Sequence, residues 1–296
     1  MSDIEEEKKN PYLEKNIDGT NKNDGPGPFV LTPENYYSDE ANRLYLSNSL
    51  FKAAYGHPAH PHPCEAAAIF GPKPESEALL VGSYVDAYFE GPDSFKEFCE
   101  QNADKIMQKS GKAKYKFILD ADAAIARASR DDVFMRYMGG EHQAVMTGRI
   151  ADHDFKIKMD AYHPDEMIVD LKYVKSSGED YIEALKKRGT FIESYGYFIQ
   201  GAIYQEIVYQ NTGKRLPFFI AYITKENVPD FGVVEVPQDK LDDALEYVRL
   251  CLTAKPFSVL RANPGRCNRR SCAYCRDLKK LSGPISYEDF EQYAAT

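Results

Sequence analysis

Three consecutive apolar segments in the middle of the chain place the strongest constraint on its fold. They are rich in β-branched residues and partly alternate between apolar and polar positions. The segments are residues 142–150, 155–163 and 166–174. A period of two over such short stretches is typical of half-buried strands, so we predict that they form a three-stranded meander.

Helical patterns lie on both sides of these strands. We predict helices that begin at Ser47 and that cover residues 78–91, 121–129, 179–211 (interrupted near Gly189) and 238–252, and further strands over 217–224 and 231–236. This order predicts an α/β (α+β) fold with a central mixed β-sheet flanked by helices. Residues 1–28 are polar and charged, so we expect a flexible acidic tail before a single domain over residues 29–296.

The charge and hydropathy patterns exclude several classes of protein. The chain has 46 acidic and 37 basic residues, a net charge of -9, so it does not bind nucleic acid through bulk positive charge. Its basic residues are concentrated instead in residues 261–280, which contain seven Arg or Lys and one acid. We find no apolar run of the ~18–20 residues that a membrane span needs. The amino-terminal residues contain no apolar signal segment, so we expect a cytoplasmic protein.

The last two central segments carry the residues with the clearest chemistry. Asp160 lies on one strand, and Asp170 and Lys172 lie on the next. Residues i and i+2 of a strand share a face, so Asp170 and Lys172 point the same way while Leu171 packs into the core. Two carboxylates and the Leu171 carbonyl would form a hard oxygen site suited to Mg²⁺ or Mn²⁺. The alternatives are that Asp170 and Lys172 belong to the solvated face of an edge strand, or that they form an ordinary ion pair.

This arrangement resembles the PD-(D/E)XK nuclease superfamily, in its RecB-like and RecE-like exonuclease branch, over most of residues 31–280. Its motif matches Asp160, Asp170 and Lys172, and the resemblance implies a restriction-endonuclease-like core in which these residues hold one or two Mg²⁺ ions. Lys172 would then position a water or offset charge in the transition state.

Two further motifs of that branch have counterparts here. The pattern G-x-x-x-H-x-x-x-E matches Gly82, Asp86 and Glu90, with Asp86 as an oxygen ligand where His is usual. The pattern Q-x-x-x-Y matches Gln200 and Tyr204, which the resemblance implies contact DNA. Without the resemblance, Asp86 would be an exposed helix carboxylate, and Gln200 and Tyr204 an ordinary helix surface pair.

The resemblance implies a Mg²⁺-dependent exonuclease that acts on linear double-stranded DNA, 5′ to 3′, in phage recombination. Its expected setting is a bacterial host cell, with a phage as one source of the gene. Its expected partners are a single-strand annealing protein and further copies of the chain. Two alternatives remain open: an iron–sulfur nuclease of the CRISPR-adaptation type, and a catalytically idle DNA-binding or scaffold protein that keeps the fold.

Three cysteines cluster near the carboxyl end, at Cys267, Cys272 and Cys275. Their C-x4-C-x2-C spacing indicates a metal site that lacks a fourth ligand. Several nucleases of the RecB branch hold a [4Fe-4S] cluster with one cysteine before the nuclease motifs and three after, and Cys64 lies where the first would be. The spacing departs from those relatives, which leaves open a zinc site completed by Cys64, His62 or His60, or a set of free thiols.

Overall fold

The computed structural model describes residues 29–60, 62–72, 76–111, 113–257 and 264–295. The tail expected over residues 1–28 lies outside the described residues. The helices are α2 Asp39–Leu44, α3 Asn48–Tyr55, α4 Glu65–Phe70, α5 Glu77–Glu90, α6 Pro92–Gln101, α7 Ala103–Ile106, α8 Lys116–Ala128, α9 Asp132–Tyr137, α10 Phe191–Ser194, α11 Tyr197–Thr212, α12 Gln238–Ala254, α13 Ala273–Asp277 and α14 Tyr287–Ala294, with a 3-10 turn at Glu183–Leu185. The strands are β1 Ala144–Ile150, β2 His153–Met159, β3 Ala161–His163, β4 Met167–Val174, β5 Asp180–Ile182, β6 Lys187–Gly189, β7 Phe218–Thr224 and β8 Phe231–Glu235. In this part of the chain, every helix is too short or too polar to cross a bilayer.

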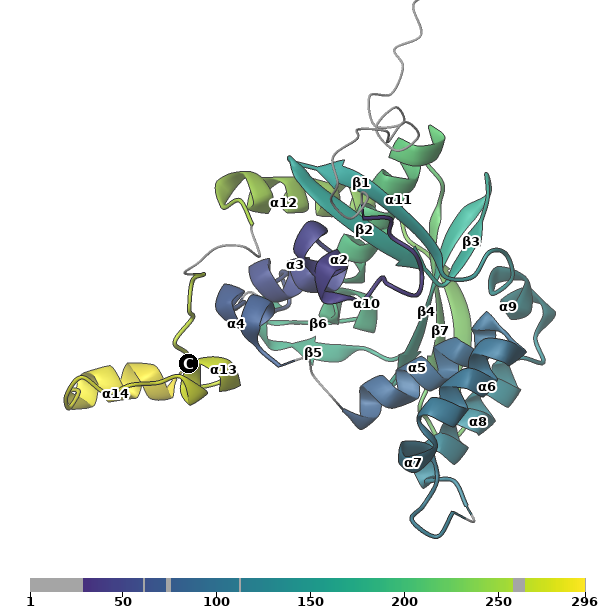
Figure 1. Cartoon of the computed structure of the whole chain (residues 1–296), viewed down its shortest axis with the longest axis horizontal. Helices are drawn as coiled ribbons and strands as arrows, with labels where there is room; N and C mark the ends of the chain where they lie inside the picture. The colour runs from purple at the N-terminus through teal and green to yellow at the C-terminus, as the bar shows by residue number, and fades with distance from the viewer. Residues whose placement is uncertain (1–28, 61, 73–75, 112, 258–263, 296) are drawn as a thin grey trace, which may run out of the picture.

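The central sheet is mixed, as the sequence predicts. Its four strands run in the order β3-β4-β7-β8, with β4 and β7 parallel and the two outer pairs antiparallel. Figure 1 shows β4 and β7 side by side, with α5, α6 and α8 gathered near one end and the β1–β2 hairpin at the other. The α/β (α+β) architecture with a sheet flanked by helices is therefore confirmed.

The predicted three-stranded meander is wrong in one respect. Residues 155–163 do not form one strand: the chain breaks at Asp160 into β2 and β3. β2 pairs with β1 in a separate two-stranded sheet, whereas β3 pairs with β4. The break places Asp160 at the point where the chain passes from one sheet to the other.

Residues of β4 alternate between two hydrophobic cores. Ile168 packs with α11 and α12 in the first core, and Val169 and Leu171 pack with α5 and α8 in the second. Side chains at alternate strand positions point to opposite faces, so Asp170 lies on the α11 face of the sheet. The predicted inward placement of Leu171 is confirmed, with 3% of its surface exposed.

The helix predicted over residues 179–211 is partly wrong. Residues 180–189 form the β5–β6 hairpin, in which Asp180 is the partner of Gly189. Thr190 and Glu193 then form a capping box that begins the short helix α10. Gly196 follows with a φ of +63°, and only then does α11 begin. A left-handed residue cannot continue an α-helix, so α10 and α11 are separate elements.

Ser47 begins α3 as predicted, since its side chain accepts a hydrogen bond from the Leu50 amide. An N-cap of this kind satisfies one of the amide groups that the first turn leaves free. The cap orients α3, whose Phe51 lies in the first core and whose Lys52 reaches the Tyr195 carbonyl at the end of α10 and the Tyr197 ring at the start of α11.

Helix α11 approaches the sheet closely at Gly201. A Cβ atom there would lie 2.5 Å from Phe218 Cδ1 and 2.8 Å from Leu241 Cδ2. Both neighbours are buried, with at most 1% exposed, so neither side chain has room to move. In contrast, a Cβ at Gly82 of α5 would have no neighbour within 4 Å.

Alanine at these two helical glycines should therefore have opposite effects on stability. We expect Gly201→Ala to lower the free energy of unfolding by about 1–3 kcal/mol through overpacking. Gly82→Ala should raise it by about 0.5–1 kcal/mol, because the glycine loses more backbone freedom on folding. Urea unfolding measures both. Equal stability of the Gly201→Ala variant and the wild type would contradict the close packing of α11 on β7 and α12.

Candidate functional site

A buried ion pair on β4 forms the centre of the candidate site. Lys172 Nζ contacts Asp170 Oδ2, and Asp170 has only 2% of its surface exposed. Gln200 of α11 donates a hydrogen bond of 2.5 Å from Nε2 to Asp170 Oδ1. The carboxylate is thus held by a neighbour on its own strand and by a side chain of the covering helix. Asp170 and Lys172 share a face of the strand, as the sequence predicts.

Asp160 lies beside this pair because of the break between β2 and β3. Its Oδ2 accepts a hydrogen bond of 2.8 Å from the backbone amide of Leu171. Since Leu171 is the residue between Asp170 and Lys172, this bond fixes the Asp160 carboxylate against the centre of β4. The Leu171 carbonyl as a metal ligand stays a prediction.

Tyr204 and Gln200 lie one turn apart on α11, and both reach the site from the same side. The Tyr204 hydroxyl donates a hydrogen bond of 3.0 Å to the carbonyl of Lys158, two residues before Asp160. Tyr204 and Gln200 are each 7% exposed. The structure therefore shows both residues holding β2 and β4 in place, and their contact with DNA stays a prediction.

Asp86 of α5 completes the set of carboxylates. It is half-buried, and burial together with the charges of Asp160 and Asp170 raises its pKa well above the usual range. Glu90, one turn later on α5, also contributes to this rise. The charges of Asp160 and Asp170 therefore act on Asp86. Its place as a ligand of the same ion stays a prediction, because the ligand atoms found within 4.8 Å of one another in the described residues are those of four cysteines and not these carboxylates.

Burial raises the pKa of Asp170 to about 7; the charge of Lys172 lowers it and that of Asp160 raises it. Burial also raises the pKa of Asp160, against the effect of Lys172. For Lys172, burial lowers the pKa, but Asp170 and Asp160 outweigh it and the net shift is upward. Lys172 therefore stays an ammonium, suited to holding or offsetting negative charge and not to accepting a proton.

The donor set fits a divalent cation. The three carboxylates of the predicted site (Asp86, Asp160 and Asp170) are poorly solvated, and the positive charge of Lys172 lowers the pKa of each. Burial is the largest cause of their raised pKa values, and a bound cation would favour the charged carboxylates. Oxygen ligands are those that Mg²⁺ and Mn²⁺ prefer.

Several residues beside the site were missed by sequence reasoning. Lys172 Nζ lies 5.0 Å from the ring centroid of Tyr197, and Lys52 Nζ lies 5.4 Å from the same ring. On another element, Lys158 Nζ lies 4.7 Å from the ring of Tyr37. No local pattern marks these residues, because α3, the segment before α2, β2 and α11 meet only in the folded chain.

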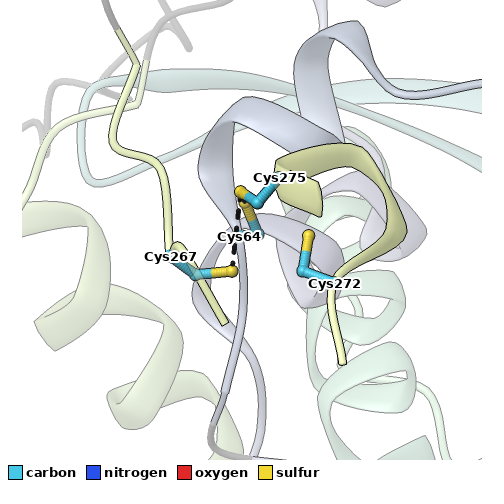
Figure 2. A group of neighbouring side chains, drawn as sticks. All are labelled: Cys64, Cys267, Cys272 and Cys275. Atoms are coloured by element: carbon cyan, nitrogen blue, oxygen red, sulfur yellow. Dashed lines mark hydrogen bonds between the residues drawn. The ribbon is translucent and has the colours of Figure 1, made fainter. Parts of the chain in front are cut away.

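A second site lies at the start of α4 and around α13. The Sγ atoms of Cys64, Cys267, Cys272 and Cys275 all lie within 4.8 Å of one another, as Figure 2 shows. The distance from the Cys275 sulfur is 3.5 Å to Cys64 and 3.8 Å to Cys267. Cys64 thus joins the three carboxyl-terminal cysteines, at the position where the resemblance implies a fourth ligand. His60 and His62 do not belong to this group; His60 instead packs its ring edge-to-face against His57.

The four sulfurs suit a soft or borderline metal. Tetrahedral zinc with Zn–S bonds of about 2.3 Å sets its sulfurs about 3.8 Å apart, close to the shorter separations seen here. Cys275 is buried, and although burial opposes it, hydrogen bonds from the Asn268 backbone, Cys64 and Arg266 lower its pKa to about 6. A stabilised thiolate is the form that binds metal.

Polar contacts next to the cysteines fasten the carboxyl-terminal segment to α4. Glu65 is 4% exposed; its Oε2 lies 2.6 Å from Lys255 Nζ and accepts a hydrogen bond of 3.1 Å from the Gly265 amide. The Ala66 amide donates to the Gly265 carbonyl at 3.1 Å. Beyond this attachment α13 and α14 extend to one side of the molecule, as Figure 1 shows.

Comparisons with known proteins agree with this geometry. Residues 47–278 match the model of a family described as "PDDEXK-like domain of unknown function (DUF3799)". A crystal structure from Eubacterium rectale, named "Putative exonuclease", is 39% identical and covers 89% of this chain and 98% of its own, with a TM-score of 0.79. No curated protein matches the chain. The family match spans more than half of the sequence, and the chain belongs to the PDDEXK-like nuclease family.

Proposed function

We propose that the protein is a Mg²⁺- or Mn²⁺-dependent exonuclease that hydrolyses phosphodiester bonds at the ends of linear double-stranded DNA. The observation that carries the proposal is the Asp170–Lys172 pair, held by Gln200 and bordered by Asp160. A scaffold protein would gain little stability from burying this ion pair, because proteins in which hydrophobic residues of similar volume replace such a pair are often equally stable or more stable. The name of the similar Eubacterium rectale protein supports the same activity.

The side chains divide the chemistry between them. Asp86, Asp160 and Asp170 would hold the cation, which neutralises charge on the phosphate and lowers the pKa of a bound water. Lys172, held as an ammonium by the two strand carboxylates, orients the water and offsets the charge that develops in the transition state. Gln200 keeps the Asp170 carboxylate in position by its hydrogen bond to Oδ1.

A DNA-binding surface follows from the basic segment around the cysteines. Its described basic residues are Arg266, Arg269, Arg270, Arg276, Lys279 and Lys280, and all but Arg269 are exposed. Such residues bind phosphates irrespective of sequence. A chain whose net charge is -9 would bind DNA weakly elsewhere, so this segment would guide DNA to one place.

Further parts of the proposal rest on the family resemblance. They are a 5′ to 3′ direction, a role in phage recombination inside the host cytoplasm, transfer of the product to a single-strand annealing protein, and assembly of several copies. We also propose that the four cysteines bind a metal. The order of one cysteine before the nuclease motifs and three after favours a [4Fe-4S] cluster, and the spacing of the sulfurs also fits zinc.

Loss of either member of the central pair should abolish digestion. We expect Lys172→Ala and Asp170→Asn to reduce hydrolysis of linear duplex DNA in Mg²⁺ at least about a hundredfold, because each removes charge that acts on the transition state. Lys225→Ala is the control: this lysine lies over the Tyr173 ring, outside the carboxylate group. Thermal melting checks that each variant is folded. A folded Lys172→Ala variant with full activity would overturn the catalytic assignment.

The role of Asp86 can be tested through the metal requirement. We expect Asp86→Asn to raise the Mg²⁺ concentration that gives half-maximal activity, because an amide is a weaker ligand than a carboxylate. Asp120→Asn, on the exposed side of α8, is the control and should not change it. Activity is measured over a Mg²⁺ titration after treatment with a chelator. If both variants titrate like the wild type, Asp86 is not a ligand.

The cysteine site is tested by its metal content. We expect protein purified without oxygen to contain iron and sulfide and to absorb visible light, and Cys64→Ser to lose the metal. Cys251→Ser is the matched control, since this half-buried cysteine lies outside the group. Elemental analysis and the visible spectrum measure both variants. A colourless protein that contains one zinc ion would show that the site binds zinc and not an iron–sulfur cluster. A protein without metal would exclude both assignments.

A further inference from the structure

Two lysines from distant parts of the chain share one aromatic ring beside the site. Lys172 of β4 and Lys52 of α3 lie 5.0 Å and 5.4 Å from the Tyr197 ring centroid. Lys172 is already paired with Asp170. Lys52 instead donates a hydrogen bond of 2.9 Å to the backbone carbonyl of Tyr195, and it forms no ion pair with any described residue.

The ammonium of Lys52 is poorly compensated. Burial and the charge of Lys172 lower the pKa of Lys52 to about 8, against the weaker opposing effect of Asp170. A phosphate placed here would supply the missing negative charge and accept the two remaining N–H donors of the ammonium.

An exposed aromatic surface adjoins the two lysines. The rings of Tyr195 and Tyr197 stack with centroids 5.8 Å apart and an angle of 30° between their planes. Tyr195 is 50% exposed, so part of its ring remains accessible to solvent. The left-handed Gly196 between the two tyrosines allows this turn from α10 to α11. Adjacent cations and aromatic rings are the elements by which proteins bind unpaired nucleotides.

We propose that Lys52, Tyr195 and Tyr197 form a nucleotide subsite next to the scissile phosphate, in which Lys52 binds a neighbouring phosphate and Tyr195 stacks on a base. The subsite rests on the proposed function, because it would bind the nucleotide next to the phosphodiester bond that is hydrolysed at Asp170 and Lys172. It also assigns a function to α3: its Ser47 cap and buried Phe51 fix the helix that delivers Lys52.

The test measures binding apart from cleavage. All variants are made in the Asp170→Asn protein, and a labelled single-stranded dodecamer is titrated by fluorescence anisotropy in Mg²⁺ at several salt concentrations. Lys52→Met should weaken binding about tenfold and reduce the slope of log affinity against log salt by about 0.7, the value for one phosphate contact on a single strand. Tyr195→Leu should weaken binding about tenfold and leave the slope unchanged.

Two control variants and one rescue separate the subsite from a structural role. Lys96→Met changes an exposed lysine of α6, and Tyr209→Leu changes a tyrosine at the far end of α11 whose exposure is similar to that of Tyr195. Both lie outside the site and should change neither quantity. Lys52→Arg should restore the salt slope. If Lys52→Arg and Lys52→Met are equally weak, or if Lys52→Met keeps the full slope, Lys52 is only a link between α3 and the Tyr195 backbone and the subsite is overturned.

Failure of the subsite can be told from failure of the proposed function. Digestion of duplex DNA by the wild type together with an unchanged salt slope in Lys52→Met overturns the subsite alone. A wild type that does not digest DNA, with a slope that still falls in Lys52→Met, overturns the exonuclease and supports the subsite as a binding site. A protein that neither binds nor digests DNA overturns both.

Discussion

The buried pair of Asp170 and Lys172 is the interaction on which the rest of the site depends. Taking two charges out of water costs several kcal/mol for each, and their attraction offsets this only with good geometry and further hydrogen bonds. Here β4 is an inner strand: β7 pairs with residues 168–174, which include Asp170 and Lys172, and β3 pairs with residues 167–169 just before them. Gln200 supplies the additional hydrogen bond to the carboxylate. The pair is therefore supported by both the sheet that carries it and the helix α11 that covers it.

The break in the chain at Asp160 is the second decisive feature. The chain leaves the β1–β2 sheet at Met159 and enters the central sheet at Ala161, so Asp160 lies between the two. At this break, Asp160 accepts a hydrogen bond from the Leu171 amide. The Tyr204 hydroxyl donates a hydrogen bond to the carbonyl of Lys158, two residues before Asp160. Catalytic side chains need this kind of support from a second set of residues, since small displacements weaken transition-state contacts strongly.

The four cysteines give the carboxyl-terminal segment a fixed place. Cys64 precedes α4, whereas the other three lie more than 200 residues later, and Glu65 adds two polar contacts to the same attachment. A metal at this position would close a long loop of chain, which is where a cross-link restricts the unfolded state most. It would also hold the basic residues around α13 near α4, on the same side of the molecule as α3 and Lys52.

The sequence by itself determined the local parts of this protein. A period of two predicted β1 and β4, and it placed Asp170 and Lys172 on one face, because alternation along a strand is a property of neighbouring residues. β7 and β8 were also predicted as strands. The α12 helix and the Ser47 cap follow in the same way, while the residues of the family motif came from resemblance. Only the tertiary structure decided the break at Asp160, the β5–β6 hairpin in place of helix, and the meeting of Lys52 with Lys172 over Tyr197. These features depend on how segments far apart in the chain pack together, and packing at long range leaves no periodic pattern in the residues that it joins.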